Sequence, residues 1–214
     1  MHIQDYIDHT ILKPTATIAD IEKLCNEAIA HKFFAVCVNG CYVKSAKELL
    51  LDSSVNLAAV IGFPLGAMST EAKIFESKNC VANGADEIDM VINVGWLKSG
   101  KTDLVEQEIS NIKKAIGKKV LKVIIETCYL THEEKIKACE LAVAAGADFV
   151  KTSTGFGSGG ATLEDVKLMK DVVGHMAKIK ASGGIRDRAT ALKYLALGVS
   201  RIGTSAGITI SSTE

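Results

Sequence analysis

The chain has 214 residues, of which 48% are hydrophobic and 23% are charged. This composition excludes a disordered chain, and the length is sufficient for one domain with a sizeable core, so we expect a single domain over residues 1–214. Basic and acidic residues number 25 each. That balance argues against a general nucleic-acid binder or a membrane-surface binder.

Signals for export, membrane insertion and metal binding are absent from the sequence pattern. Residues 1–5 lack a basic segment followed by an apolar run, and no stretch of about 18 uncharged apolar residues occurs, so we expect neither a secretory signal nor a membrane span. The five histidines show no metal-ligand spacing, and the six cysteines form no Cys-x-x-Cys pair. We therefore expect reduced thiols, a cytoplasmic location and no metal site.

Strand and helix patterns alternate along the whole chain. Short apolar runs rich in β-branched residues predict strands at residues 6–10, 33–39, 56–62, 87–93, 120–126, 149–152, 178–181 and 201–204. Helical periodicity predicts a helix after each strand, at residues 18–31, 42–51, 70–83, 101–116, 132–145, 163–173, 187–197 and 206–211. Each unit therefore pairs one strand with the helix that follows it.

Capping residues support these helix boundaries. Thr17 and Thr131 are placed to cap the helices that they precede, and Glu134 completes a capping box with Thr131. Gly84 and Gly146 each end a helix, at the position where a left-handed backbone is common. Eight alternating units imply a parallel sheet closed into a (β/α)8 TIM barrel. An open doubly wound sheet is the less favoured alternative.

Two of the predicted strands end in lysine. Residues 147–155 run Ala-Asp-Phe-Val-Lys-Thr-Ser-Thr-Gly, and residues 177–184 run Ala-Lys-Ile-Lys-Ala-Ser-Gly-Gly. An ammonium that faces a core costs several kcal/mol unless it is paired or neutral, and a neutral lysine is a nucleophile for carbonyls. A lone lysine of this kind more often extends to the surface, but two in successive units can approach closely. Lys151 and Lys180 are therefore candidate catalytic residues.

The alternation of side chains along each strand gathers more charge at the same place. An inward face would bring together Asp8, Asp89, Lys151 and Lys180, and TIM barrels carry their active residues at the carboxyl ends of the strands. Asp89 is either a proton carrier, directly or through a bound water, or the structural ion-pair partner of a lysine. The sequence pattern leaves both roles open.

A second ammonium offers a way to activate either lysine. A free lysine amine has a pKa near 10.4, whereas nucleophilic work requires a value nearer 7, a shift of about 3 units or about 4 kcal/mol. A like charge at about 4 Å supplies about that much at an effective dielectric of about 20, and burial adds to it. We expect Lys180 to lower the pKa of Lys151 in this way, although the pattern fits the reverse assignment equally well.

Glycine-containing loops follow the last two strands. They are Gly183-Gly184-Ile185-Arg186 and Gly203-Thr204-Ser205-Ala206-Gly207. Phosphate sites in TIM barrels commonly use the loops after strands seven and eight, where glycines let backbone amides approach the oxygens. The hydroxyls of Thr204 and Ser205 are further donors. The two loops together predict a phosphate site.

At these residues the chain resembles the class I deoxyribose-phosphate aldolases, which act through a Schiff base. The resemblance covers nearly the whole chain and is carried by Asp8-His9-Thr10, Leu12-Lys13-Pro14, Val36-Cys37-Val38-Asn39, Ile61-Gly62-Phe63-Pro64-Leu65-Gly66, Gly84-Ala85-Asp86-Glu87-Ile88-Asp89-Met90-Val91, Glu126-Thr127-Cys128, Phe149-Val150-Lys151-Thr152-Ser153-Thr154-Gly155-Phe156, Lys180-Ala181-Ser182-Gly183-Gly184-Ile185-Arg186 and Arg201-Ile202-Gly203-Thr204-Ser205. So many matches in register make the signal specific.

The resemblance implies reversible cleavage of 2-deoxy-D-ribose 5-phosphate to D-glyceraldehyde 3-phosphate and acetaldehyde, in deoxyribonucleotide catabolism. By position, Lys151 matches the Schiff-base lysine, Lys180 the lysine that perturbs it and assists proton transfer, and Asp89 the acid/base aspartate. No cofactor or metal is implied, because the protonated imine polarises the substrate. The implied partners are sugar-phosphate and aldehyde substrates and further copies of the chain, in a homodimer or homotetramer, with no nucleic acid and no membrane.

The residues that we expect to bind the substrate or its phosphate come from the strand ends and the loops after them. They are Asp8, Thr10, Cys37, Gly155, Gly183, Gly184, Arg186, Gly203, Thr204 and Ser205.

Three positions depart from the family pattern. Gly40 stands where proline is frequent, and we expect only a looser turn. Phe156 stands where some members carry lysine, so that one phosphate contact is expected to be missing. Lys178 adds a charge two residues before Lys180, and we expect it to be solvated at the barrel floor. Two rival functions stay open: a Schiff-base barrel with a different acceptor, such as a transaldolase, and a catalytically silent barrel that binds a sugar phosphate as a sensor.

Overall fold

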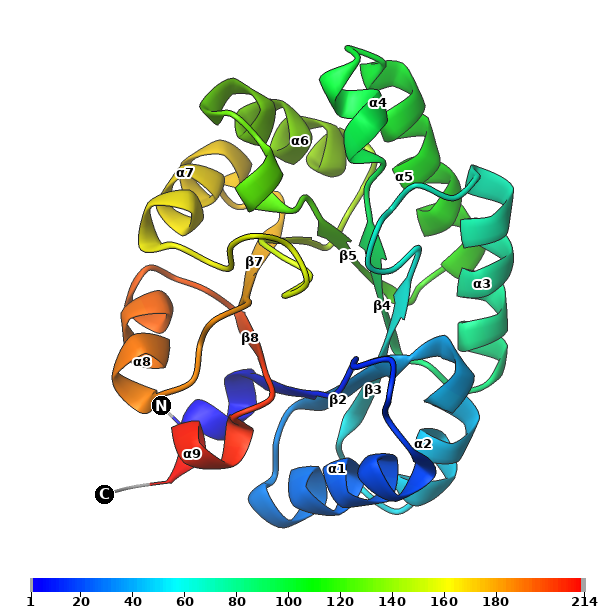
Figure 1. Cartoon of the computed structure of the whole chain (residues 1–214), viewed down its shortest axis with the longest axis vertical. Coiled ribbons are helices and arrows are strands. Elements are labelled where there is room, and N and C mark those ends of the chain that lie inside the picture. Colours follow the sequence, from blue (N-terminus) through cyan, green and yellow to red (C-terminus); the bar gives the residue numbers. More distant parts are fainter. Residues whose placement is uncertain (1, 213–214) are drawn as a thin grey trace.

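A closed parallel β-barrel forms the centre of the structure, a computed structural model that describes residues 2–212. The strands pair in the order β1-β2-β3-β4-β5-β6-β7-β8, and β8 also pairs with β1, so that the sheet closes on itself. Helices surround the barrel as a ring (Figure 1). The predicted TIM barrel is therefore confirmed, and the open doubly wound sheet is wrong.

The elements alternate along the chain as the sequence pattern predicts. The strands are β1 (Ile7–Thr10), β2 (Ala35–Asn39), β3 (Asn56–Ile61), β4 (Glu87–Val91), β5 (Val120–Ile124), β6 (Phe149–Lys151), β7 (Lys178–Ser182) and β8 (Arg201–Thr204). The α-helices are α1 (Ile18–His31), α2 (Val43–Leu49), α3 (Thr70–Ala82), α4 (Val94–Lys98), α5 (Thr102–Ile116), α6 (His132–Ala144), α7 (Leu163–Val173), α8 (Arg188–Ala196) and α9 (Gly207–Ser211). Three short 3-10 helices are η1 (Ile3–Tyr6), η2 (Gly40–Tyr42) and η3 (Thr127–Tyr129).

The predicted boundaries lie within two residues of the observed ones, but helix α4 was not predicted. The sequence pattern extends the fourth strand to residue 93, whereas β4 ends at Val91. The side-chain oxygen of Asn93 accepts a hydrogen bond from the Trp96 amide at 3.1 Å, and this contact starts α4. The cap at Asn93 therefore ends the extended backbone that the apolar run over residues 87–93 predicts, and a helix begins instead. The expected capping box at Thr131 and Glu134 is confirmed.

The two faces of the barrel wall differ in chemistry. Outward-facing apolar side chains, such as Ile88, Val123 and Val150, are fully buried against the helices. The inner face has a small apolar patch on its β2–β3 side, at Cys37, Ala58 and Val60, whereas the rest of its middle layer is ionic. No helix within residues 2–212 combines the length and apolar character needed to cross a membrane.

A buried ion pair anchors the loops after β3 and β4. The ammonium of Lys73 donates hydrogen bonds to Glu108 and to the Val91 carbonyl, each at 2.8 Å, and both side chains are fully buried. Lys73 lies on α3 and Glu108 on α5, so that the pair ties both helices to the end of β4. In the loop after β3, Gly66 has a left-handed backbone, with φ +66°, and packs against the Ile92 carbonyl that follows β4.

We predict that Gly66→Ala destabilises the fold more than Gly100→Ala does. Both glycines have positive φ, which costs an alanine about 1 kcal/mol. A Cβ at Gly66 would also lie 2.0 Å from the Ile92 carbonyl oxygen, whereas one at Gly100 meets no atom within 4 Å. The expected loss in unfolding free energy is therefore about 1 kcal/mol at Gly100 and about 3 kcal/mol at Gly66, measured by urea unfolding. Equal losses would show that the close approach at Gly66 is relieved cheaply.

Candidate active site

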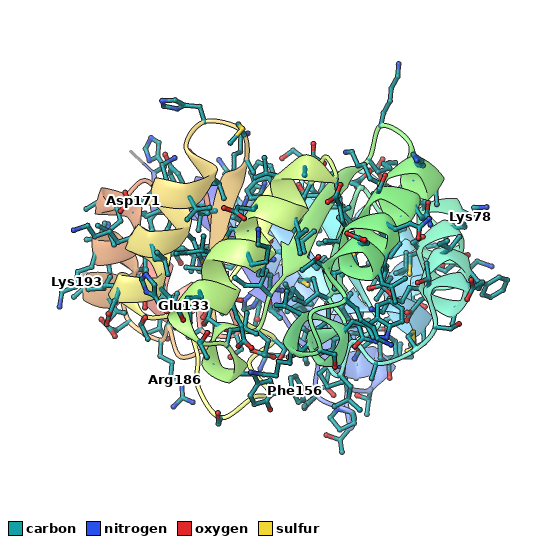
Figure 2. The ribbon with its side chains drawn as sticks, turned by 90° about the horizontal axis from the view of Figure 1, so that it is seen from above. Lys78, Glu133, Phe156, Asp171, Arg186 and Lys193 are labelled. Carbon is teal, nitrogen blue, oxygen red and sulfur yellow. The ribbon has the colours of Figure 1, made fainter. Side chains whose placement is uncertain are left out.

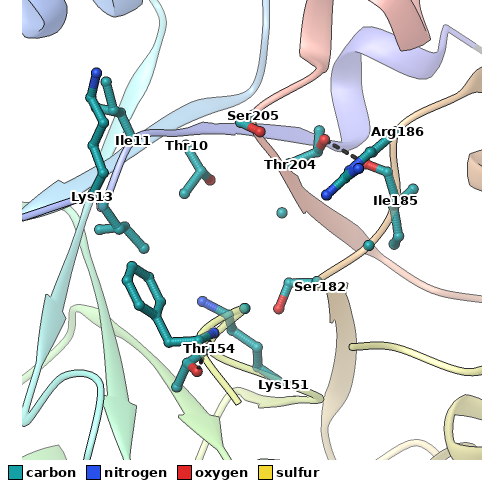
Figure 3. A pocket seen from close by; sticks show the side chains of 16 residues that line it. Thr10, Ile11, Lys13, Lys151, Thr154, Ser182, Ile185, Arg186, Thr204 and Ser205 are labelled. Carbon is teal, nitrogen blue, oxygen red and sulfur yellow. Dashed lines mark hydrogen bonds between the residues drawn. The ribbon is translucent and has the colours of Figure 1, made fainter. Parts of the chain in front are cut away.

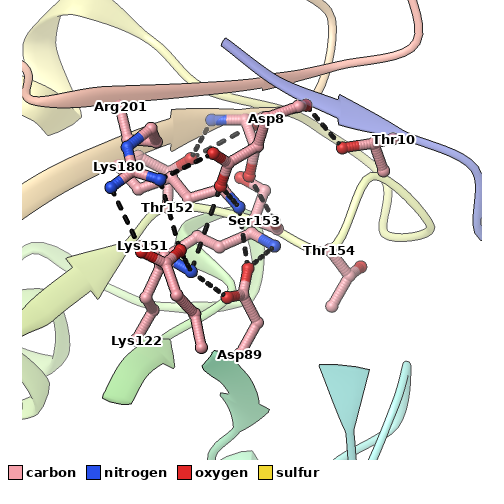
Figure 4. Close-up of polar contacts among 12 residues, drawn as sticks. Asp8, Thr10, Asp89, Lys122, Lys151, Thr152, Ser153, Thr154, Lys180 and Arg201 are labelled. Carbon is pink, nitrogen blue, oxygen red and sulfur yellow. Dashed lines mark hydrogen bonds and ion pairs between the residues drawn. The ribbon is translucent and has the colours of Figure 1, made fainter. Parts of the chain in front are cut away.

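Seven charged side chains meet inside the barrel, and we call them the barrel ion cluster. Each is at most 5% exposed. They come from six of the eight strands and point toward one another across the barrel axis (Figure 4). The members are Asp8 on β1, Glu87 and Asp89 on β4, Lys122 on β5, Lys151 on β6, Lys180 on β7 and Arg201 on β8. The predicted gathering of Asp8, Asp89, Lys151 and Lys180 is confirmed.

Asp89 is the centre of this cluster. Its Oδ2 accepts hydrogen bonds from Lys151 and Lys180, each at 2.8 Å, and its Oδ1 accepts one from Lys122 at 2.7 Å. Because each amine lies 2.8 Å from the same oxygen, the amines of Lys151 and Lys180 are at most twice that distance apart. Burial alone would raise the pKa of Asp89, but the three ammonium groups hold it well below its usual range. Asp89 is thus ionised near neutral pH in the free protein.

A second carboxylate layer lies beneath Asp89. Asp8 accepts hydrogen bonds from Lys180 and, at 2.8 Å, from Arg201. Glu87 accepts from Arg201 at 3.2 and 3.3 Å and lies 2.5 Å from the amine of Lys122. The Arg201 guanidinium also stacks on the Phe34 ring, 3.5 Å from its centroid. The layer fixes the positions of all the cations except Lys151.

Sequence analysis missed Lys122 and Arg201 as members of this cluster. Lys122 lies opposite Asp89 in the β4–β5 register, and Arg201 lies opposite Lys180 in the β7–β8 register. Side-chain parity along residues 120–126 would have placed Lys122 inward, since it lies two residues from Ile124 on the inner face. Lys178, in contrast, is exposed, as expected, and lies 5.6 Å from the Phe149 ring centroid.

The main cause of the lowered pKa of Lys151 differs from the expected one. Burial lowers the pKa of Lys151, Asp89 opposes this, and Lys180 contributes a smaller lowering. The expectation that a second ammonium supplies most of the shift is therefore wrong, because Lys180 is itself held by two carboxylates. Burial would also lower the pKa of Lys180, but Asp8 and Asp89 outweigh it and raise that pKa. Lys151 is thus the amine that deprotonates more readily.

A cavity of about 360 Å³ opens above the cluster at the carboxyl ends of the strands. The amine of Lys151 reaches into it from one side, and the loops after β7 and β8 form the opposite wall (Figure 3). Of the expected binding residues, those on its wall are Thr10, Gly155, Gly183, Gly184, Arg186, Gly203, Thr204 and Ser205. Asp8 and Cys37 are fully buried and are not on this wall.

The loop glycines permit backbone that other residues would strain. Gly183 and Gly184 have φ of +88° and +83°, and a Cβ on Gly183 would lie 2.9 Å from Gly160. Thr204, expected to donate to a phosphate, instead donates its hydroxyl hydrogen to the Ile185 carbonyl at 2.7 Å. Thr204 therefore joins the two loops, and the hydroxyl of the exposed Ser205 and the backbone amides are the remaining donors there.

Glu126 organises the loop after β6, a role that the sequence reasoning missed. Its carboxylate accepts hydrogen bonds from the Thr154 hydroxyl and, at 3.2 Å, from the Thr154 amide. Glu126 is also left-handed, with φ +55°, which is unusual for a residue other than glycine. Residues 155–160 have the Gly-x-Gly-x-x-Gly spacing of dinucleotide-binding loops, but the helix that follows them, α7, begins only at Leu163. The loop instead lies over the cavity.

Phe156 and Arg186 extend from the same edge of the barrel (Figure 2). Phe156 lines the cavity, and its ring meets Phe63 edge-on, with centroids 5.4 Å apart. The position therefore presents an apolar side chain to the cavity. Arg186 is exposed and lines the opposite side. It belongs to the loop after β7, so a phosphate at the β7–β8 loops would meet its charge.

A buried amine at the floor of a TIM-barrel cavity is an arrangement that can form a Schiff base with a carbonyl substrate. Comparisons with known proteins show the family of the chain. Residues 3–209 match the model of the DeoC/LacD family aldolases. The chain belongs to this aldolase family. It is 58% identical over 210 residues to the deoxyribose-phosphate aldolase of Finegoldia magna, covering 98% of this chain and 99% of that protein. It is 59% identical to that of Carboxydothermus hydrogenoformans, covering 97% and 93% of the two chains.

Solved structures place this family member among aldolases as well. The aldolase QR15 superposes with a TM-score of 0.94 at 44% identity, over 98% of this chain and 94% of that chain. The deoxyribose phosphate aldolase from Aeropyrum pernix, described as tetrameric, superposes with a TM-score of 0.89 at 31% identity, over 98% and 89% of the two chains. The barrel is therefore shared with solved aldolase structures.

We predict that Asp8→Asn destabilises this aldolase in a pH-dependent way. Burial would raise the pKa of Asp8, but Lys180 and Arg201 hold it at about 2, below its usual value of 3.8. The carboxylate therefore stabilises the fold fully above about pH 4 and loses its contribution, about 2 kcal/mol, as the pH falls toward 2. The difference in unfolding free energy between the wild type and Asp8→Asn should shrink over that interval, measured by urea unfolding at fixed pH.

Asp171→Asn is the matched control, since Asp171 is exposed on α7 and lies outside the cluster (Figure 2). Its unfolding curve should follow that of the wild type across the same pH range. A difference for Asp8→Asn that stays constant down to pH 2 would contradict the low pKa of Asp8.

Proposed function

We propose that this protein is a deoxyribose-phosphate aldolase. It cleaves 2-deoxy-D-ribose 5-phosphate reversibly to D-glyceraldehyde 3-phosphate and acetaldehyde. The observation that carries the proposal is the amine of Lys151, which is buried, has a lowered pKa and reaches the floor of the cavity. Full-length relatives with this activity at 58% and 59% identity support the choice of substrate.

In the first step the neutral amine of Lys151 attacks the aldehyde carbon of the open-chain sugar. The carbinolamine that forms takes up a proton at its hydroxyl, loses water and becomes a protonated imine. Only the neutral amine attacks, so the lowered pKa of Lys151 increases the reactive fraction at pH 7. The raised pKa of Lys180 supports a different role, because Lys180 stays positively charged beside the same Asp89 oxygen and disfavours a second charge on Lys151.

In the second step the imine accepts electrons as the bond between C2 and C3 breaks. Asp89, through a water, takes the proton from the C3 hydroxyl, and D-glyceraldehyde 3-phosphate leaves. The same relay returns the proton to C2 of the enamine, and hydrolysis of the imine releases acetaldehyde and regenerates Lys151. The hydrogen bond of 2.8 Å between Lys151 and Asp89 supports this role, since it puts the carboxylate beside the reacting carbons.

The phosphate of the substrate binds at the loops after β7 and β8 in this proposal. The exposed backbone of Gly183 and Gly184, the Ser205 hydroxyl and the Arg186 guanidinium are the donors that support it. Asp8 and Cys37 act from beneath the floor, Asp8 by holding Lys180 and Cys37 by packing beside it. The apolar face of Phe156 closes the cavity without adding a charge.

We further propose that residues 1–214 form one aldolase domain, that the protein is cytoplasmic, and that it forms a homodimer or homotetramer. The Aeropyrum pernix relative is described as tetrameric, which supports self-association. Exposed apolar side chains support it too, since Leu65 is 80% exposed and Phe75 is 73% exposed.

We predict that acetaldehyde and borohydride label Lys151. The wild type should gain one reduced two-carbon adduct at this residue, because the neutral amine forms the imine that borohydride reduces. Lys151→Met should lose both the adduct and at least about 10³-fold in kcat, since the covalent route is removed. Lys178→Arg is the matched control on the neighbouring strand β7 and should keep both. Peptide mass spectrometry and steady-state kinetics provide the measurements.

Binding of the sugar phosphate without any adduct would support the silent sensor and contradict the aldolase. Faster turnover of larger ketose phosphates than of 2-deoxyribose 5-phosphate would instead favour a transaldolase-like reaction. These two outcomes separate the rival functions from the proposed one.

We predict that Arg186→Gln raises the KM for 2-deoxyribose 5-phosphate about tenfold, which corresponds to loss of one charge-assisted hydrogen bond of about 1.4 kcal/mol. The KM for unphosphorylated 2-deoxyribose should not change, because that sugar offers no charge to Arg186. Arg188→Gln removes the same charge from α8, where Arg188 donates to the Ile210 carbonyl, and should leave both constants unaltered. An equal rise for both sugars would contradict a phosphate contact.

A further inference from the structure

The barrel ion cluster is not electrically balanced. It contains three carboxylates, Asp8, Glu87 and Asp89, and four side chains that are cations in their usual state. The fourth cation beyond Lys151, Lys180 and Arg201 is Lys122, which is fully buried and does not line the cavity. A sealed interior tolerates an unpaired charge poorly, and a lysine relieves such an excess by losing its proton.

The cations share the carboxylates unequally. Lys122 contacts Glu87 and Asp89 at 2.5 and 2.7 Å and lies 4.0 Å from Asp8. Lys180 contacts Asp8 and Asp89, and Arg201 contacts Asp8 and Glu87. Lys151 contacts one carboxylate within residues 2–212, Asp89, and it shares that oxygen with Lys180. The excess positive charge therefore falls on the amine that borders the cavity.

We propose that Lys122 is a positioning residue for the reaction at Lys151: by occupying Oδ1 of Asp89 from below, it makes the buried cations outnumber the carboxylates and leaves Lys151 without a full countercharge. Its amine is nowhere on the cavity wall, so it acts through Asp89 and not on the substrate. The fourth cation is thus built into the interior to keep the nucleophile neutral. This inference rests on the proposed function.

Other groups on the inner barrel wall do not change this balance. The ionisable side chains that face Lys151 from the strands are Asp8 on β1, Cys37 on β2, Glu87 and Asp89 on β4, Lys122 on β5, Lys180 on β7 and Arg201 on β8. Strand β3 contributes Ala58 and Val60, which carry no charge. Burial raises the pKa of the Cys37 thiol, so that it stays uncharged near neutral pH.

The test is the pH dependence of kcat/KM in three variants, since its lower limb reports deprotonation of the free enzyme. Lys122→Met leaves three cations against three carboxylates. The midpoint should move to higher pH by about one unit, because the negative charge of Asp89 then stabilises the protonated amine of Lys151 more strongly. Glu87→Gln leaves four cations against two carboxylates and should move the midpoint to lower pH. The double variant restores an excess of one and should return the midpoint to near the wild-type value.

A merely structural role for Lys122 would lower the plateau of kcat/KM without moving the midpoint, and that result would overturn the proposal. Shifts of the same sign in Lys122→Met and Glu87→Gln would overturn it too. If Lys122→Met fails to fold, as judged by circular dichroism, the opposite shift in Glu87→Gln and its reversal in the double variant decide the question. Acetaldehyde labelling of the wild type is the separate check: labelling absent from Lys151 rejects the proposed function, whereas labelling with unmoved midpoints rejects only the role of Lys122.

Discussion

The carboxylate of Asp89 is the contact on which the interior of this protein depends. Three ammonium groups from three consecutive strands, β5, β6 and β7, converge on its two oxygens. Each of those cations would cost several kcal/mol in a dry core without a carboxylate partner, so the register of these strands is tied to the register of β4. The same contact keeps Lys151 close to a negative charge and within reach of the cavity. Folding therefore requires Asp89 to stabilise the buried ammonium groups, whereas the reaction requires Lys151, beside the same carboxylate, to lose its proton.

The barrel resolves these demands by separating its layers. The outer face of the wall is apolar and packs on the helices, which provides the bulk of the hydrophobic stabilisation. The inner face carries the barrel ion cluster, and the cavity lies beyond that cluster at the carboxyl ends of the strands. In the lower layer, Arg201, Glu87 and Asp8 satisfy one another and stay charged. Lys151, at the boundary between that layer and the cavity, is the member of the cluster with the least electrostatic support, and burial lowers its pKa further. Lys151 is thus reactive because it lies where the ion pairs of the lower layer end and the cavity begins.

The cavity wall, unlike the ionic layer on the strands, is made of loops that hydrogen bonds hold in place. Glu126 holds the loop after β6 through Thr154, and Thr204 joins the loops after β7 and β8 through the Ile185 carbonyl. These contacts fix backbone amides and glycines around a space open to solvent, which suits an anionic substrate group. Apolar Phe156 and cationic Arg186 both line this space.

The sequence by itself determined the eight strand–helix units, their boundaries to within two residues, and the inward placement of Lys151, Lys180, Asp8 and Asp89. Those features are local, since periodicity, capping and side-chain parity are properties of short segments. The tertiary structure decided which lysine deprotonates more readily, because that depends on how residues far apart in the chain share carboxylates. It also brought Lys122 and Arg201 into the cluster, committed the Thr204 hydroxyl to a neighbouring loop, and made burial the main cause of the lowered pKa of Lys151. Register between strands and exclusion of water exist only once the barrel is closed.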